Sequence, residues 1–142
     1  GFETVGYTAC ALLDMALHAR TDAEGVDIAE FERAELERIG MPPGTYVYHR
    51  LAHFQHLFSS SGYAAGYYVY MWAEVLDADG YGAFTEAGDP CEPSVASRLL
   101  KHVYSAGNRV EPRAAYRAFR GRDAAVEPML AKRGLVPDNA PA

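Results

Sequence analysis

The sequence predicts an all-α protein, and three observations lead to this fold class. Apolar residues recur at helical spacing in one stretch after another, start and stop signals bound these stretches, and no pair of segments alternates as strands do. With 142 residues the chain is long enough for one domain with its own core. We therefore expect a single helical domain over residues 1–136 and a disordered tail over residues 137–142.

The first part of the chain is expected to contain three helices. One, amphipathic, covers about residues 2–20, where apolar side chains return every three or four positions. A second starts at Asp27, because Glu30 three residues later completes a capping-box-like signal, and it stops at Gly40. A third and shorter helix is expected over residues 47–58.

The Ser/Gly segment 59–62 breaks this pattern, and the helical pattern resumes at Tyr63. This helix is expected to run toward Asp79-Gly80, with a further segment over residues 81–86. Three more helices are expected over residues 93–106, 112–120 and 125–133. Glu-Pro pairs begin two of them, with proline at the first helical position, and Gly107 and Gly134 stand where left-handed C-caps belong.

Composition excludes several classes of protein. A formal charge of −6 argues against a nucleic-acid partner, and no apolar run reaches the ~20 residues of a membrane span. The two cysteines, Cys10 and Cys91, are too few and too far apart for a disulfide framework, so we expect a reducing compartment, the cytoplasm. The chain opens at Gly1 directly into a helical pattern, which suggests a fragment of a longer protein.

Three histidines are the first candidates for chemistry. His49, His53 and His56 are spaced by four and three residues, which places them on one face of a helix, as a transition-metal site would need. Chance spacing is the stronger interpretation, because no acidic residue lies between Tyr46 and Tyr70 to complete or orient such a site. The chain contains no HExxH zinc motif and no GxSxG, so we expect no metal on this chain and no serine hydrolase.

Three tyrosines are the second candidates. On a helix, Tyr63, Tyr67 and Tyr70 fall on one stripe, opposite a core face with Tyr68 and Trp72. Aromatic residues at this spacing are most often core. However, a phenol also donates a hydrogen bond, and the Ser/Gly loop just before them is typical of a mobile substrate loop rather than of core packing. The pattern therefore favours a binding cleft lined by tyrosines.

The longest of these motifs resembles a known family. The run HFQHLFSSSGYAAGYYVYMWAEVLDAD, His53–Asp79, is similar to the C-terminal signature of the thimet oligopeptidase, oligopeptidase A and peptidyl-dipeptidase family of zinc metallopeptidases. The resemblance continues through Tyr104–Asn108, Tyr116–Gly121 and Pro128–Leu135, and it includes the opening helix, Phe2–His18. It implies a multi-helix C-terminal subdomain of a clam-shaped helical enzyme that hydrolyses short peptides. In this family an HExxH helix and a downstream Glu hold the zinc, and all of them precede the matched region.

The resemblance also implies roles for individual residues. Tyr63 and Tyr70 would be catalytic, bonding substrate and stabilising the tetrahedral intermediate, and Tyr67 would shape the adjoining subsite. His56, or alternatively His53, would contact the peptide backbone, and Gly62 would belong to the loop that closes over it. The loop from His56 to Tyr63 is longer here than in the best-known members.

On this interpretation the chain is inactive alone. The full-length enzyme carries zinc, this chain carries none, and its partners are short peptides and the missing N-terminal catalytic portion. Neither nucleic acid nor membrane is expected as a partner. Self-association is expected through helix faces that the missing portion would cover. The alternative is a free-standing helical module that uses the Tyr63, Tyr67 and Tyr70 cleft for a ligand or a partner protein. The family contains both enzymes that remove C-terminal dipeptides and enzymes that cut internally, and the sequence favours neither.

Overall fold

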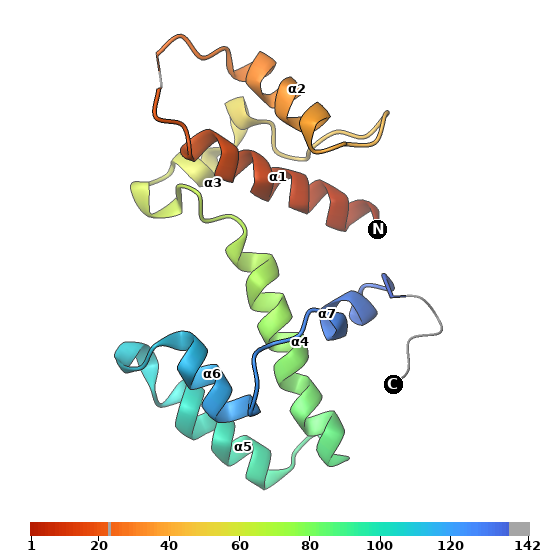
Figure 1. Ribbon diagram of the computed structural model, residues 1–142, viewed down its shortest axis with the longest axis vertical. Coiled ribbons are helices and arrows are strands. Elements are labelled where there is room, and N and C mark those ends of the chain that lie inside the picture. Colours follow the sequence, from red (N-terminus) through yellow and green to blue (C-terminus); the bar gives the residue numbers. More distant parts are fainter. Residues whose placement is uncertain (23, 137–142) are drawn as a thin grey trace. The chain divides into compact units, whose positions relative to one another are not determined.

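The computed structural model describes residues 1–22 and 24–136, and over these residues every regular element is a helix, so the predicted all-α class is confirmed (Figure 1). The chain divides into two compact units, Gly1–Tyr70 and Met71–Ala142. The single domain expected over residues 1–136 thus contains two units, and its behaviour as one domain stays a prediction. The predicted disordered tail, 137–142, lies outside the described residues.

The first unit is built on two helices that contact each other, α1 (Phe2–His18) and α2 (Ile28–Arg38) (Figure 1). The Asp27 carboxylate caps α2 as predicted, accepting the backbone N–H groups of Ala29 and Glu30 at 3.0 Å each. Three short elements follow: the 3₁₀ turn η1 (Leu51–His53), α3 (Gln55–Phe58) and the 3₁₀ turn η2 (Ser61–Tyr63). The buried core joins α1 to this later segment through Ala9, Cys10, Leu13, Val47, Leu51, Phe54 and Leu57. Cys10 is thus a small residue of this core.

The helix predicted over residues 47–58 is wrong. Arg50 is extended, and Phe54, with φ −82° and ψ 66°, separates η1 from α3. A contact with α2 explains the break, because the buried Glu32 carboxylate accepts the backbone N–H of Leu51 at 2.7 Å and the Arg50 guanidinium at 2.8 Å. The apolar residues of this stretch, Leu51, Phe54 and Leu57, are still buried, but from tighter turns.

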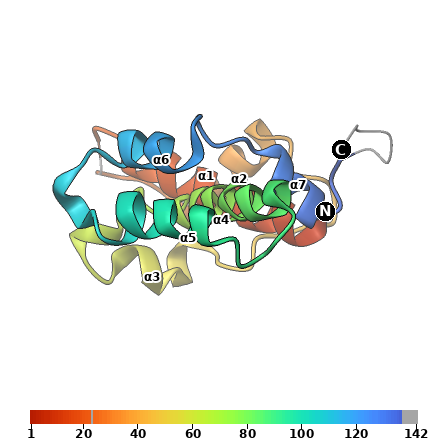
Figure 2. The same cartoon turned by 90° about the horizontal axis from the view of Figure 1, so that it is seen from below.

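The second unit is formed by α4 (Val69–Ala87), whose first two residues belong to the first unit, followed by α5 (Pro93–Leu99), the π-helical turn η3 (Leu100–Tyr104), the 3₁₀ turn η4 (Gly107–Arg109), α6 (Pro112–Arg120) and α7 (Glu127–Lys132). Helices α5 and α6 lie side by side in both views (Figures 1 and 2). The buried core of this unit joins them to α4 through Ala83 of α4, Val95 of α5 and Phe119 of α6. The prolines predicted to open α5 and α6 do so, after Glu92 and Glu111, whose side chains cap the helices.

Helix α4 corrects two predictions. It begins at Val69 rather than at Tyr63, and it continues without interruption through Gly80, so the segments predicted before and after Gly80 are one helix. Its predicted core face is only partly buried: Val75 is in the interior, whereas Trp72 and the preceding Tyr68 are exposed.

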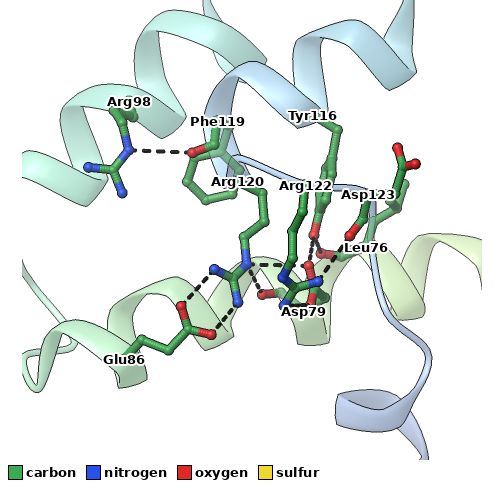
Figure 3. Close-up of polar contacts among 9 residues, drawn as sticks. All are labelled: Leu76, Asp79, Glu86, Arg98, Tyr116, Phe119, Arg120, Arg122 and Asp123. Atoms are coloured by element: carbon green, nitrogen blue, oxygen red, sulfur yellow. Dashed lines mark hydrogen bonds and ion pairs between the residues drawn. The ribbon is translucent and has the colours of Figure 1, made fainter.

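A buried carboxylate organises the polar interior of the second unit. The Asp79 side chain is fully buried, and Tyr116, Arg120 and Arg122 all point toward it (Figure 3). The Tyr116 hydroxyl and the Arg122 guanidinium both donate to it at 2.6 Å, and Arg120 Nε lies 3.3 Å from it. Arg120 also donates to the Glu86 carboxylate, at 2.7 Å through Nη1. These contacts connect α4 to α6 and to the segment that follows it.

Among the helices of the described ranges, none combines the length and the apolar character required to cross a membrane.

Candidate functional site

The backbone of the tyrosine segment, residues 62–70, is made of turns. Tyr63 ends η2, and Gly66 N–H then donates to Tyr63 C=O at 3.1 Å. Between them Ala64 has φ −60° and ψ 130°, and Ala65 has φ +56°, which together form a type II turn. A second turn follows, in which Val69 N–H donates to Gly66 C=O at 3.1 Å. The predicted helical stripe of Tyr63, Tyr67 and Tyr70 is therefore wrong as a backbone geometry.

The same three tyrosines nevertheless gather around one side chain, His56. The centroid of the His56 ring lies 4.8 Å from that of Tyr63, 5.8 Å from that of Tyr67 and 5.9 Å from that of Tyr70. A hydrogen bond joins Tyr70 Oη and His56 Nε2 at 3.1 Å. Because a phenol hydroxyl both donates and accepts, this bond forms with either imidazole tautomer. The three tyrosines are thus close together as expected, but consecutive turns bring them together rather than one face of a helix.

Two open cavities flank the His56–Tyr70 pair. The larger, about 480 Å³, is lined by Tyr7, His49, His53, Phe54, Gln55, His56, Tyr67 and Tyr70. The smaller, about 300 Å³, is lined by His56, Gly62, Tyr63, Gly66, Tyr68, Val69 and Tyr70. Neither lining contains a carboxylate, and both offer aromatic rings together with hydroxyl or imidazole groups. Such a surface is suited to a neutral or negatively polarised group, for example a peptide carbonyl.

The tyrosines differ in their surroundings. Tyr63 is 45% and Tyr70 51% exposed, whereas Tyr67 is less exposed and packs against the core of the first unit. Burial raises the pKa of the Tyr67 phenol, and the nearby Cys10, Tyr7 and Tyr70 raise it further. Tyr67 is therefore a neutral hydroxyl at physiological pH.

Sequence reasoning missed two residues of α1 that hold this segment. The fully buried Asp14 carboxylate accepts the backbone N–H groups of Ala65 at 3.0 Å and Tyr67 at 2.9 Å. The Tyr7 hydroxyl donates to the backbone carbonyl of Tyr67, and the two rings stack with centroids 5.1 Å apart. One available signal was an acidic residue inside the apolar run ALLDMAL, where a buried carboxylate needs partners.

The three histidines do not form the predicted helical face, because η1, Phe54 and α3 divide their segment. The His49 ring instead stacks on Phe54, with ring centroids 4.8 Å apart. Within residues 1–22 and 24–136, no three His, Cys, Asp or Glu side chains come together as a metal site would require. The described residues therefore do not fit a zinc ion.

Comparison with known proteins gives the family of this helical chain. The sequence profile of peptidase family M3 matches residues 1–135. The chain therefore belongs to peptidase family M3, and the resemblance seen in its motifs is confirmed.

Curated relatives agree with this assignment. The chain is 36% identical over 140 residues to the dipeptidyl carboxypeptidase of Escherichia coli (strain K12), covering 95% of this chain and 20% of the relative. It is 36% identical over 127 residues to oligopeptidase A of the same organism, covering 87% of this chain and 18% of the relative. It is also 34% identical over 134 residues to a probable cytosolic oligopeptidase A of Arabidopsis thaliana, covering 92% and 19%. The chain thus spans about a fifth of the length of these relatives.

Proposed function

We propose that this chain provides the substrate-binding part of a zinc-dependent oligopeptidase, which hydrolyses peptide bonds in short peptides. The family assignment and the names of the relatives support the reaction class. In this proposal the zinc is held by residues outside the chain, in the N-terminal catalytic portion, and residues 1–142 alone are inactive. A cytoplasmic location is also part of the proposal, and one relative is named cytosolic.

The observation that carries the proposal is the hydrogen-bonded Tyr70–His56 pair, with the rings of Tyr63 and Tyr67 around the same imidazole. His56 orients the Tyr70 hydroxyl. Tyr63 and Tyr70, both about half exposed, donate hydrogen bonds to the carbonyl oxygen of the scissile bond as negative charge develops on it. For Tyr70 this requires that His56 Nε2–H donates to the phenol oxygen, which leaves the Tyr70 O–H free for the substrate.

Tyr67 and His56 have supporting roles in this proposal. The Tyr67 ring forms one wall of the larger cavity, and the His56 ring faces both cavities, so a peptide lying along them touches both residues. Gly62 lies in the lining of the smaller cavity, at the end of the Ser/Gly loop. Relatives with both names match at similar identity, so the proposal is limited to their shared class, peptide hydrolysis.

The test is Tyr70→Phe in the intact protein that contains this chain. The phenylalanine keeps the ring and removes one donor. We expect kcat on a short peptide to fall about 10²–10³-fold while KM changes little, because an oxyanion donor acts in the transition state. Tyr81→Phe, at an exposed tyrosine further along α4, is the matched control and is expected to leave both constants unchanged.

An unchanged kcat in Tyr70→Phe would contradict the transition-state role of the Tyr70 hydroxyl.

A second measurement addresses the zinc. Residues 1–142 alone are expected to contain no stoichiometric zinc and to cleave no short peptide. Stoichiometric zinc by elemental analysis, together with hydrolysis that a chelator abolishes, would contradict the proposal.

A further inference from the structure

We propose that Asp14 is a positioning residue for the tyrosine segment: its carboxylate, assisted by the Tyr7 hydroxyl, holds residues 64–67 in the conformation that presents the tyrosines to His56. The inference rests on the proposed function for its catalytic consequence. The structural part of it, the tether between α1 and the segment, stands on geometry alone.

The tether begins on one face of α1. Tyr7 and Asp14 are seven residues apart, two turns of the helix, and therefore project on the same side. His18 follows one turn later and places its Nδ1 2.8 Å from the Asp14 carboxylate. A helix otherwise rich in apolar residues thus presents a polar line toward the tyrosine segment.

The two carboxylate oxygens of Asp14 accept different backbone donors. Oδ1 accepts the N–H of Ala65, and Oδ2 accepts the N–H of Tyr67, so the residues on both sides of Gly66 are bonded to the same carboxylate. On the other side of Tyr67, its backbone carbonyl accepts the Tyr7 hydroxyl. Both the amide and the carbonyl of Tyr67 are therefore bonded to α1, which fixes the direction in which the Tyr67 ring leaves the backbone.

The conformation held in this way is one that the local sequence disfavours. Ala65 has φ +56°, in the left-handed region, at the turn position where glycine is preferred. Such a conformation persists only where the surrounding structure over-determines it. A buried carboxylate likewise persists only where donors satisfy it. The hydrogen bond from Ala65 N–H to Asp14 therefore serves both residues: it gives the buried carboxylate a donor, and it holds Ala65 in the left-handed conformation.

The consequence for the site follows from the position of the tether. It lies between Tyr63 and Tyr70, because the tethered amide of Ala65 is two residues after Tyr63 and that of Tyr67 is three residues before Tyr70. If the tether is lost, the turn at Ala65 relaxes, and Tyr63, Tyr67 and Tyr70 no longer share the His56 ring. The hydroxyl groups of Tyr63 and Tyr70 are then still present but no longer oriented toward the substrate, and the reaction slows for that reason.

The experiment uses the intact protein that contains this chain, with Asp14→Asn and, as a second variant that removes only a hydroxyl, Tyr7→Phe. The asparagine is isosteric but turns an N–H donor toward one of the two backbone donors. Hydrogen–deuterium exchange of residues 62–70, followed by mass spectrometry, is the first readout, and kcat and KM on a short peptide are the second. Asp79→Asn is the matched control, because Asp79 is also a fully buried aspartate and is bonded to Tyr116, Arg120 and Arg122 instead.

We expect Asp14→Asn to accelerate exchange in residues 62–70 by about tenfold or more, since hydrogen bonds to a charged group are lost. Tyr7→Phe should give a smaller increase in the same segment, and Asp79→Asn none. In Asp14→Asn, kcat on a short peptide should fall and KM should rise. Tyr70→Phe, in contrast, is expected to change kcat alone. If Asp14→Asn does not fold, the increase in Tyr7→Phe carries the test.

Exchange in residues 62–70 that is unchanged in the folded variants would overturn the inference, whatever the activity. Equal acceleration in Asp79→Asn would also overturn it, because the effect would then be a general loss of stability. Accelerated exchange in a protein whose wild type hydrolyses no peptide would support the tether and reject the proposed function, so the two failures are distinguishable.

Discussion

Replacing Asp79 by alanine tests whether one carboxylate holds the second unit together. The change removes the acceptor of the Tyr116 hydroxyl and of the Arg122 guanidinium, each at 2.6 Å, and the counter-charge 3.3 Å from Arg120 Nε (Figure 3). It also leaves a small void beside residues that are themselves partly buried. The backbone carbonyl of residue 79, which accepts Arg120 Nε at 3.0 Å, remains.

The magnitude follows from what each partner loses. Breaking a buried ion pair by removing one member costs about 3–5 kcal/mol, because the other charge stays buried without compensation. Here the loss is moderated. Arg120 keeps its bonds to Glu86 and to the backbone, and Arg122 is 45% exposed and is partly rehydrated. We therefore expect the lower end of the range, about 3 kcal/mol, which is a large share of the ~5–15 kcal/mol that stabilises a typical domain.

Urea unfolding of the 142-residue chain measures this, followed by far-UV circular dichroism and by the fluorescence of its single tryptophan, Trp72, which lies on α4. The matched control is Asp77→Ala, on the same helix but with a side chain 74% exposed. The control is expected to unfold as the wild type does. A loss below about 1 kcal/mol in Asp79→Ala, the scale of one ordinary hydrogen bond, would show that the network adds no more than such a bond.

The same carboxylate predicts a pH dependence. Burial by itself raises the pKa of Asp79, but the hydrogen bonds from Tyr116 and Arg122 and the charges of Arg120 and Arg122 outweigh it, so the pKa is lowered. Its stabilising effect is therefore present above the unfolded pKa of about 3.9 and is lost as the pH falls through the lower folded value. The difference between wild type and Asp79→Ala should shrink below about pH 4. A difference that stays constant down to pH 2 would contradict this reasoning.

Two further substitutions test the turns of the first unit. Ala65→Gly should raise the free energy of unfolding by up to about 1 kcal/mol, because glycine adopts the left-handed φ without strain; a clear loss of stability in a urea titration would argue against the strain. Glu32→Gln should cost about 1–3 kcal/mol, because the neutral amide accepts from only one of the donors Leu51 N–H and Arg50 Nε and turns its own NH2 group toward the other. A Glu32→Gln protein that unfolds at the wild-type urea concentration would show that this carboxylate is not what interrupts the helical pattern after Arg50.

Local signals were sufficient wherever the determinants of an element lie within it. Helix α6 begins at Pro112 after a capping Glu111 and ends at Gly121 with φ +82°, and the sequence places both ends correctly. The same holds for the start of α2 at Asp27. Hydrogen-bond donors, caps and left-handed positions are readable there because all the partners are close in the chain.

Prediction failed where the partner is distant. Leu51 is bonded to Glu32, 19 residues away, and Tyr67 is bonded to Asp14, 53 residues away, so periodicity alone suggested helices in both places. The tyrosine cluster was anticipated as a set of residues but not as a geometry. A helical stripe and a pair of consecutive turns both place residues 63, 67 and 70 near one another, and the hydrogen bonds to Asp14 and Tyr7 of α1 favour the turns.

That choice explains why α4 begins where it does. If residues 63–68 extended α4, the amides of Ala65 and Tyr67 would be close to or inside the helical ladder, and the Asp14 carboxylate would be buried without those donors. With the turns, the carboxylate is satisfied, and α4 starts at Val69, two residues after the last tethered amide. The left-handed Ala65 is the local cost of this arrangement, offset by the bonds to α1. Local sequence rules therefore fail at the segment for which we propose a function, which is where such conflicts are expected to concentrate.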